Sequence, residues 1–191
     1  MTIAAAVLAA LALLPPLPAC GQDQPSLRYT PPSQSFTCDL PGPEWHAFEE
    51  EEGSGFAVHI LGPDNRGGTY RAGLDIRWVE KGQAGWLPIK KQIDERLRRN
   101  DPAAGRTATT VRPYRIPAGL ARVFEVVETR RLPGDQLPSL DEELHYYYAM
   151  IPEGESYYEI KLASTREEYF QHRDLFARFL RSFSALGVAG K

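Results

Sequence analysis

The last third of the chain, Glu142 to Phe183, constrains the fold more than any other segment. It opens with two stretches rich in tyrosine, 142–151 and 157–163, and aromatic side chains suit the half-buried surface of a β-sheet. Residues 152–156 between them contain Pro and Gly, which favour a hairpin turn. We therefore predict two neighbouring antiparallel strands, the second of which turns Tyr158, Ile160 and Leu162 to one side.

An amphipathic helix is predicted directly after these strands. Either Ser164 with Glu167 or Thr165 with Glu168 has the spacing of a capping box, so we expect the helix to begin at one of these hydroxyl residues. The helix needs a sheet face to cover, and the predicted hairpin supplies part of one. Its apolar stripe consists of residues that recur at intervals of three and four: Tyr169, Phe176, Phe179, Leu180 and Phe183.

This ending resembles a known family. The hairpin and the segments Tyr-Tyr-Glu-Ile-Lys-Leu-Ala-Ser-Thr-Arg-Glu-Glu-Tyr-Phe and Phe-Ala-Arg-Phe-Leu-Arg-Ser-Phe look like the close of the PsbP-like domains. That superfamily includes the photosystem II extrinsic protein, the Ran-binding Mog protein and many bacterial lipoproteins. The resemblance implies an α+β fold, an antiparallel sheet of about six to eight strands packed by two main helices as an α/β/α sandwich, with a long C-terminal helix. It implies no catalytic residue, because the superfamily has no shared catalytic signature.

The middle of the chain alternates between strand and turn patterns. A first helix is predicted over 87–99, with Leu87 (or Ile89), Ile93 and Leu97 as its core stripe. The remaining strands are predicted over five ranges: 36–41, 55–61, 70–80, 109–117 and 120–131.

The exposed side of this first helix is basic, and it has two interpretations. It could lie against anionic lipid beneath a membrane anchor. It could equally be a solvated face with cations gathered toward the helix C-terminus, where the helix dipole favours them, and Asp94 and Glu95 favour this second interpretation. The basic residues are Lys90, Lys91, Arg96, Arg98 and Arg99.

The N-terminus is typical of an exported protein. Residues 1–19 are predicted to be a signal peptide, because an apolar run of this length is too short to span a bilayer. Leu17-Pro18-Ala19-Cys20 resembles a bacterial lipobox, which makes Cys20 the predicted site of lipidation. We expect residues 20–35 to be the anchor cysteine and a flexible tether, 36–186 a single domain, and 187–191 a tail.

Lipidation of Cys20 would attach the chain to a membrane of the bacterial cell envelope, facing the periplasm or the cell surface. The alternative is a soluble secreted or periplasmic protein. Cys38 has no second cysteine to pair with once Cys20 carries lipid, so we expect it to be a buried apolar residue. A Cys20–Cys38 disulfide would require an unprocessed chain. The net charge of −3 argues against a general nucleic-acid partner.

The sequence nominates no catalytic residue, no metal ligand and no cofactor site. Its four histidines, His46, His59, His145 and His172, never occur as a pair at ligand spacing. The acidic run 49–52 is predicted to lie on a strand, where successive carboxylates point to opposite sides and cannot converge on a cation.

Tyr147 and Tyr157 are the candidate binding surface. If Leu144, Tyr146 and Tyr148 face the core, these two rings lie together on the opposite face, either packed in the sheet or exposed to a ligand. Three functions stay open. The first is a non-catalytic, membrane-tethered binding or assembly module with an envelope protein partner. The second is a small-molecule or lipid-binding lipoprotein with a pocket between sheet and helix. The third is an envelope hydrolase with clustered His and carboxylates.

Overall fold

The computed structural model describes residues 27–52, 55–98, 105–132 and 138–186. The predicted signal peptide, the lipidation site Cys20 and the tail 187–191 lie outside these ranges, as does the first part of the predicted tether. The predictions on them therefore stay predictions.

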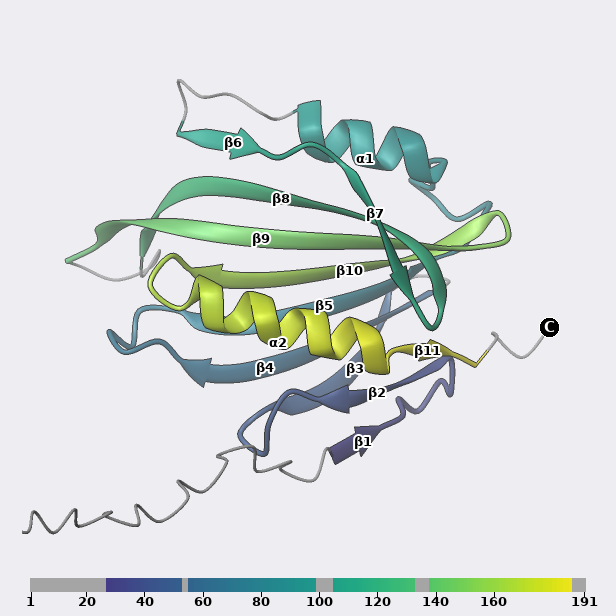
Figure 1. Ribbon diagram of the computed structural model, residues 1–191, viewed down its shortest axis with the longest axis horizontal. Coiled ribbons are helices and arrows are strands. Elements are labelled where there is room, and N and C mark those ends of the chain that lie inside the picture. Colours follow the sequence, from purple (N-terminus) through teal and green to yellow (C-terminus); the bar gives the residue numbers. More distant parts are fainter. Residues whose placement is uncertain (1–26, 53–54, 99–104, 133–137, 187–191) are drawn as a thin grey trace, which may run out of the picture.

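An eight-stranded antiparallel sheet forms the centre of the molecule, with the strand order β3-β4-β5-β10-β9-β8-β6 (Figure 1). The eighth strand, β7, pairs with the same edge of β8 as β6 does, but nearer to the start of β8. The strands are β3 (His46–Glu52), β4 (Gly55–Asp64), β5 (Arg71–Val79), β6 (Arg106–Ala108), β7 (Arg112–Ile116), β8 (Gly119–Leu132), β9 (Leu140–Glu153) and β10 (Ser156–Thr165). The predicted strands are all present, and β6 is a short strand that none of the predicted ranges contains.

One helix covers each face of this sheet. Helix α2 (Tyr169–Ser182) lies in front of the sheet in Figure 1 and buries Phe176 and Phe179 in a core with Ile160 and Leu162. Helix α1 (Ile89–Arg98) buries Ile93 in a second core with Phe124, Tyr148 and Met150. These contacts confirm the predicted α+β class, with an antiparallel sheet between two helices.

A second, three-stranded sheet has the order β1-β2-β11, from β1 (Leu27–Tyr29), β2 (Phe36–Leu40) and β11 (Ser184–Ala185). Strand β1 lies inside the range predicted to be a tether, so regular structure begins earlier than expected. Its Arg28 contacts Asp39 at 3.1 Å and donates a hydrogen bond to the carbonyl oxygen of Ser182. These contacts fix a segment whose composition alone indicates a linker.

The C-terminal helix begins at Tyr169, later than the capping-box pattern predicts. Ser164 and Thr165 belong to β10, where Thr165 is paired with Leu144 of β9. The N-cap residue is Glu168, and it makes no side-chain cap hydrogen bond. The prediction of a capping box is therefore wrong, because the long partner strand β9 keeps the hydroxyl residues in the sheet.

The apolar stripe of the first helix is confirmed, with Ile93 buried and Ile89 and Leu97 packed around it. Its basic residues do not form one surface. Arg96 turns toward the sheet and contacts Glu159, while Arg98 contacts Glu95 on the helix itself. Arg99 lies outside the described residues.

A candidate ligand groove beside helix α2

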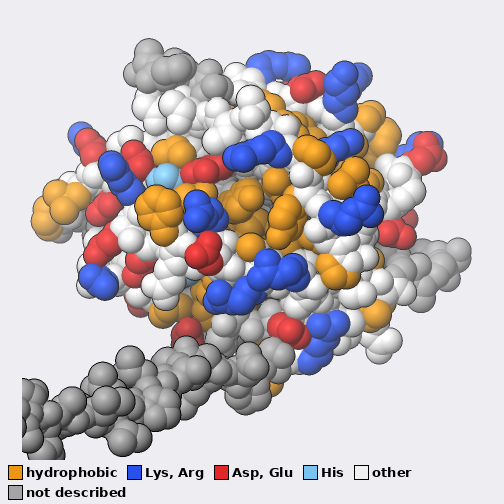
Figure 2. Space-filling view, viewed as in Figure 1, with side chains coloured by type: hydrophobic (Ala, Val, Ile, Leu, Met, Phe, Trp, Pro, Cys, Tyr) orange, Lys and Arg blue, Asp and Glu red, His pale blue; other side chains and the backbone are white. Residues whose placement is uncertain are grey.

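A groove of about 380 Å³ lies between α2 and the β7–β8 hairpin. Figure 2 shows hydrophobic side chains in the middle of this face with Lys and Arg side chains around them. The groove combines aromatic, cationic and acidic groups. Its main lining residues are Thr109, Arg112, Tyr114, Glu125, Tyr147, Tyr169 and Arg173.

The pairing of β7 with β8 positions one wall. Arg112 is opposite Val123 and Tyr114 is opposite Ala121, and side chains of paired residues share a face of the sheet. Val123 and Ala121 belong to the core under α2, so Arg112 and Tyr114 lie on the α2 side. The turn that closes the hairpin contains Gly119 at φ +128°, a conformation that favours glycine.

Tyr147, one of the two tyrosines of the candidate binding surface, lines the groove. It is half-buried, and its ring contacts that of Phe176 with centroids 5.0 Å apart. Burial raises the pKa of its hydroxyl, so the side chain is a neutral phenol that can donate a hydrogen bond.

Tyr157 does not share this surface. It is paired with Pro152 of β9 and Val79 of β5, and it packs in the α1 core with Tyr148 and Met150. It is 1% exposed, and its hydroxyl donates a 3.1 Å hydrogen bond to the carbonyl of Leu87. The prediction of a common face for Tyr147 and Tyr157 is therefore wrong.

A cluster of ionisable groups borders the groove at Glu125. The Glu125 carboxylate lies 2.6 Å from Nδ1 of His145, and Nε2 of His145 lies 2.9 Å from Glu143. The His145 ring stacks on Tyr169 with centroids 4.2 Å apart, and Tyr169 and Glu125 each influence the pKa of the other.

The cluster holds opposite charges together. Burial acts to lower the pKa of His145, but its bonds with Glu125 and Glu143 outweigh burial and raise that pKa. Burial likewise acts to raise the pKa of Glu125, but its bonds with His145 and Tyr169 lower it. Both shifts favour a charged imidazolium–carboxylate pair at neutral pH.

The space directly beneath the middle of α2 is filled. Phe176 is fully buried and Phe179 is 2% exposed, and both pack in the main core. The small-molecule hypothesis requires a pocket between sheet and helix, and the space beneath these two residues is therefore too well filled to provide it. The open space is at the N-terminal half of the helix, beside Tyr169 and Arg173.

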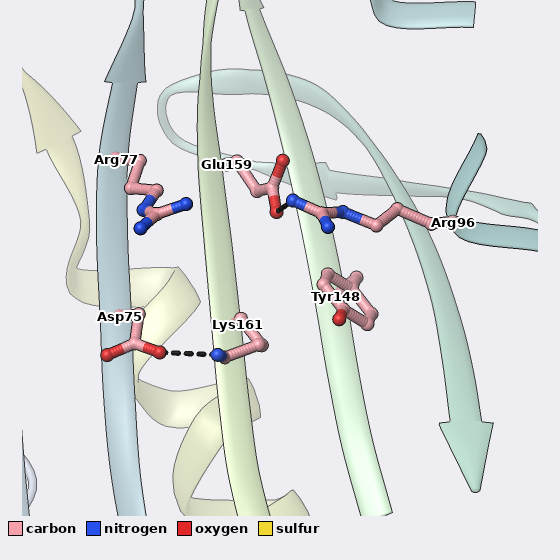
Figure 3. A pocket seen from close by; sticks show the side chains of 6 residues that line it. All are labelled: Asp75, Arg77, Arg96, Tyr148, Glu159 and Lys161. Atoms are coloured by element: carbon pink, nitrogen blue, oxygen red, sulfur yellow. Dashed lines mark hydrogen bonds and ion pairs between the residues drawn. The ribbon is translucent and has the colours of Figure 1, made fainter. Parts of the chain in front are cut away.

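A second, smaller pocket of about 120 Å³ lies on the α1 side of the sheet (Figure 3). Glu159 contacts Arg96 at 2.7 Å, and Asp75 contacts Lys161 at 2.6 Å and His59 at 2.8 Å. Arg77 and Tyr148 complete the lining. Both carboxylates form ion pairs with neighbouring cations. We therefore interpret this pocket as part of the packing between α1 and the sheet.

Within the described ranges, no group of three or more His, Cys, Asp or Glu side chains is arranged to hold a metal ion. The acidic run is part of β3, where Glu49 accepts a hydrogen bond from the backbone of Ser33. Cys38 is buried in the main core, as predicted, and it is bonded to no cysteine within the described ranges. In the same described ranges, none of the helices has the length and apolar character needed to cross a membrane.

Of the residues that line the groove, the sequence nominated Tyr147 as a candidate but did not nominate Arg112, Glu125 or Arg173. The alternation of Arg112 and Tyr114 along their strand could have placed these two residues on one face. Their meeting with α2 depends on tertiary packing between segments about sixty residues apart in the sequence, and no local pattern reports it.

No protein-family model and no curated protein sequence matches this chain. Among solved structures it is similar to cyanobacterial PsbP (CyanoP) from Synechocystis sp. PCC 6803, with 12% identity and a TM-score of 0.49, over 90% of this chain and 99% of that one. It is also similar to LpqN, described as involved in cell envelope biogenesis of Mycobacterium tuberculosis, with 12% identity and a TM-score of 0.40, over 85% and 86% of the two chains. Both likenesses concern the fold alone.

Proposed function

We propose that this protein is a membrane-tethered, non-catalytic binding module of the bacterial cell envelope, and that the groove beside α2 is its binding site. The groove is the observation that carries the proposal. Its volume of about 380 Å³ falls in the range of small-molecule sites, which are concave and combine aromatic walls with a few polar groups.

The proposal of a binding role rather than a catalytic one rests on the protonation of the cluster at Glu125. A general base at neutral pH needs a pKa near 7 and a free lone pair. Both ring nitrogens of His145 face carboxylates. The raised pKa of His145 favours the doubly protonated ring, which has no free lone pair on nitrogen. The lowered pKa of Glu125 makes its carboxylate a weaker base. This arrangement supports a structural ion pair and speaks against the hydrolase hypothesis.

The tether is supported by the sequence pattern Leu17-Pro18-Ala19-Cys20. It is tested by the intact mass of the protein in the membrane fraction of a bacterial host, for the wild type and for Cys20→Ser. We expect a mass increase corresponding to a triacylated cysteine in the wild type and its loss in the variant. An unmodified soluble wild-type protein would contradict the anchor.

The binding site is tested separately, with the Cys20→Ser chain purified from the same host. Backbone amide resonances are recorded by NMR while a library of small charged and neutral compounds is added. We expect the compounds that bind to shift amides of 109–114, 123–125 and 169–173. If no compound shifts these amides, or if every shift falls on the α1 side, the groove is not the binding site.

A further inference from the structure

We infer that the ligand of this groove is a small organic anion with a ring or another flat apolar body. Its carboxylate or phosphate group contacts Arg112 and Arg173, and its ring packs against Tyr114 and Tyr147. The inference rests on the proposed function and adds the chemical class of the ligand to it.

The charge balance of the groove favours an anion. Its charged lining residues are Arg112, Arg173 and Glu125. The charge of Glu125 is already balanced by His145 at 2.6 Å, and that of Glu143 by His145 and by Arg166 at 3.7 Å. The two arginines therefore leave a positive potential in the groove, which favours an anion.

The guanidinium groups of Arg112 and Arg173 have donors available to a ligand. Arg112 is exposed and makes no hydrogen bond or ion pair with another described residue. Among the described residues, the one ion pair of Arg173 is with Asp174 at 3.5 Å, a neighbour on the same helix whose side chain is 70% exposed. An exposed pair of this kind is weak, and a planar guanidinium binds carboxylate or phosphate with two parallel hydrogen bonds.

The tyrosines of the groove are compatible with an anion that carries a ring. Burial raises the pKa of Tyr147, and burial together with the bond to Glu125 raises that of Tyr169. Both hydroxyls therefore stay protonated and do not repel an anion. The rings of Tyr114 and Tyr147 offer an apolar surface of the kind on which a flat ligand packs.

Arg173 also contacts an exposed aromatic ring next to the groove. Phe170 is 67% exposed at the start of α2, and the Arg173 guanidinium lies 5.3 Å from its ring centroid. Arg173, which lines the groove, therefore also lies beside an exposed aromatic ring.

The experiment uses three probes with the Cys20→Ser chain: phenyl phosphate, inorganic phosphate and benzyl alcohol. Because such small ligands carry little binding energy, we expect a dissociation constant on the order of 1 mM for phenyl phosphate. Benzyl alcohol lacks the charge and inorganic phosphate lacks the ring, so we expect each to bind about tenfold more weakly or worse. NMR titration measures all three.

The variants Arg112→Gln and Arg173→Gln remove one guanidinium each, and either should weaken phenyl phosphate about tenfold. Arg178→Gln is the matched control, because Arg178 is exposed on the same helix and does not line the groove. It should leave the binding constant unchanged. Equal melting temperatures for the three variants would show that each is folded, as expected for exposed residues.

Two results would overturn the inference and leave the groove as a binding site. One is benzyl alcohol binding in the groove as tightly as phenyl phosphate. The other is phenyl phosphate binding that shifts groove amides but does not weaken in Arg112→Gln or Arg173→Gln. The failure of every probe and every library compound to shift groove amides would instead count against the proposed function itself.

Discussion

Arg96 of α1 and Glu159 of β10 form an ion pair at 2.7 Å, and Glu159 is 4% exposed. Gln92, one turn earlier on the helix, donates a second hydrogen bond to the same carboxylate at 3.1 Å. The Arg96 guanidinium also lies 5.8 Å from the ring centroid of Tyr148. A single buried carboxylate thus links the helix to the sheet at two points.

The first prediction concerns this pair. Arg96→Ala should lower the free energy of unfolding by about 1.5–3 kcal/mol, because it removes a charge-assisted hydrogen bond from the buried Glu159 carboxylate, while Arg77, paired with Glu159 on the neighbouring strand, remains. Arg98→Ala on the same helix removes an exposed partner of Glu95 and should cost less than about 1 kcal/mol. Urea denaturation of both variants measures the difference. Equal losses would mean that the Arg96–Glu159 pair is no stronger than a surface pair.

The second prediction concerns pH and His145. Its pKa is raised in the folded state, so its contribution to stability is full below the unfolded pKa of about 6.5 and is lost as the pH rises through the folded pKa. The stability advantage of the wild type over His145→Gln should therefore shrink as the pH is raised from about 6 to about 9. Unfolding free energies across this range test it.

His172 provides a control of opposite sign. Burial lowers its pKa, and it is 4% exposed beside Trp45. Its neutral form is the one that the folded state favours, so the advantage of the wild type over His172→Gln should grow as the pH rises through about 6.5. If both variants follow the same trend with pH, the shifts assigned to these two residues are wrong.

The fold was predictable from the sequence because each helix and most strands have a clear period. The stripe of Phe176, Phe179 and Leu180 needs a sheet face, and the alternation of Ile160 and Leu162 supplies it. These signals are local, and they agree with the contacts that the structure shows.

The faces of the tyrosines were not predictable in the same way. Both faces of β9 and β10 are covered by helices, so no contrast between polar and apolar residues marks an exposed side. The register decides instead. Ser156 is paired with Glu153 across the turn, so every odd-numbered residue of β10 is opposite an even-numbered residue of β9. Tyr147 and Tyr157 consequently face opposite sides, a result that follows from turn length and not from composition.

The third prediction concerns Gly62 of β4. A Cβ atom at this position would lie 2.8 Å from the Trp45 ring, which is 2% exposed. Gly62→Ala should therefore force the ring to move and lower the free energy of unfolding by about 1–3 kcal/mol. At Gly67 the nearest atom is 3.6 Å away, so Gly67→Ala should change stability by no more than about 0.5 kcal/mol. Thermal unfolding compares the two, and a tolerated Gly62→Ala would show that Trp45 has room to shift.

The fourth prediction concerns the thiol of Cys38, which is fully buried in β2. Burial raises its pKa to about 12, so at pH 8 almost no reactive thiolate is present in the folded protein. In the Cys20→Ser chain, Cys38 should react with Ellman's reagent more than about a hundredfold more slowly when folded than in urea.

The matched control for this thiol is Ser33→Cys in a chain that also carries Cys20→Ser and Cys38→Ala. Ser33 is exposed a few residues before the same strand, so its thiol should react at nearly the rate seen in urea. Slow reaction at both positions would point to a property of the reagent and not to burial. Fast, stoichiometric labelling of Cys38 in the folded chain would mean that β2 opens readily, and that this strand is held less firmly than its contacts with α2 and β11 indicate.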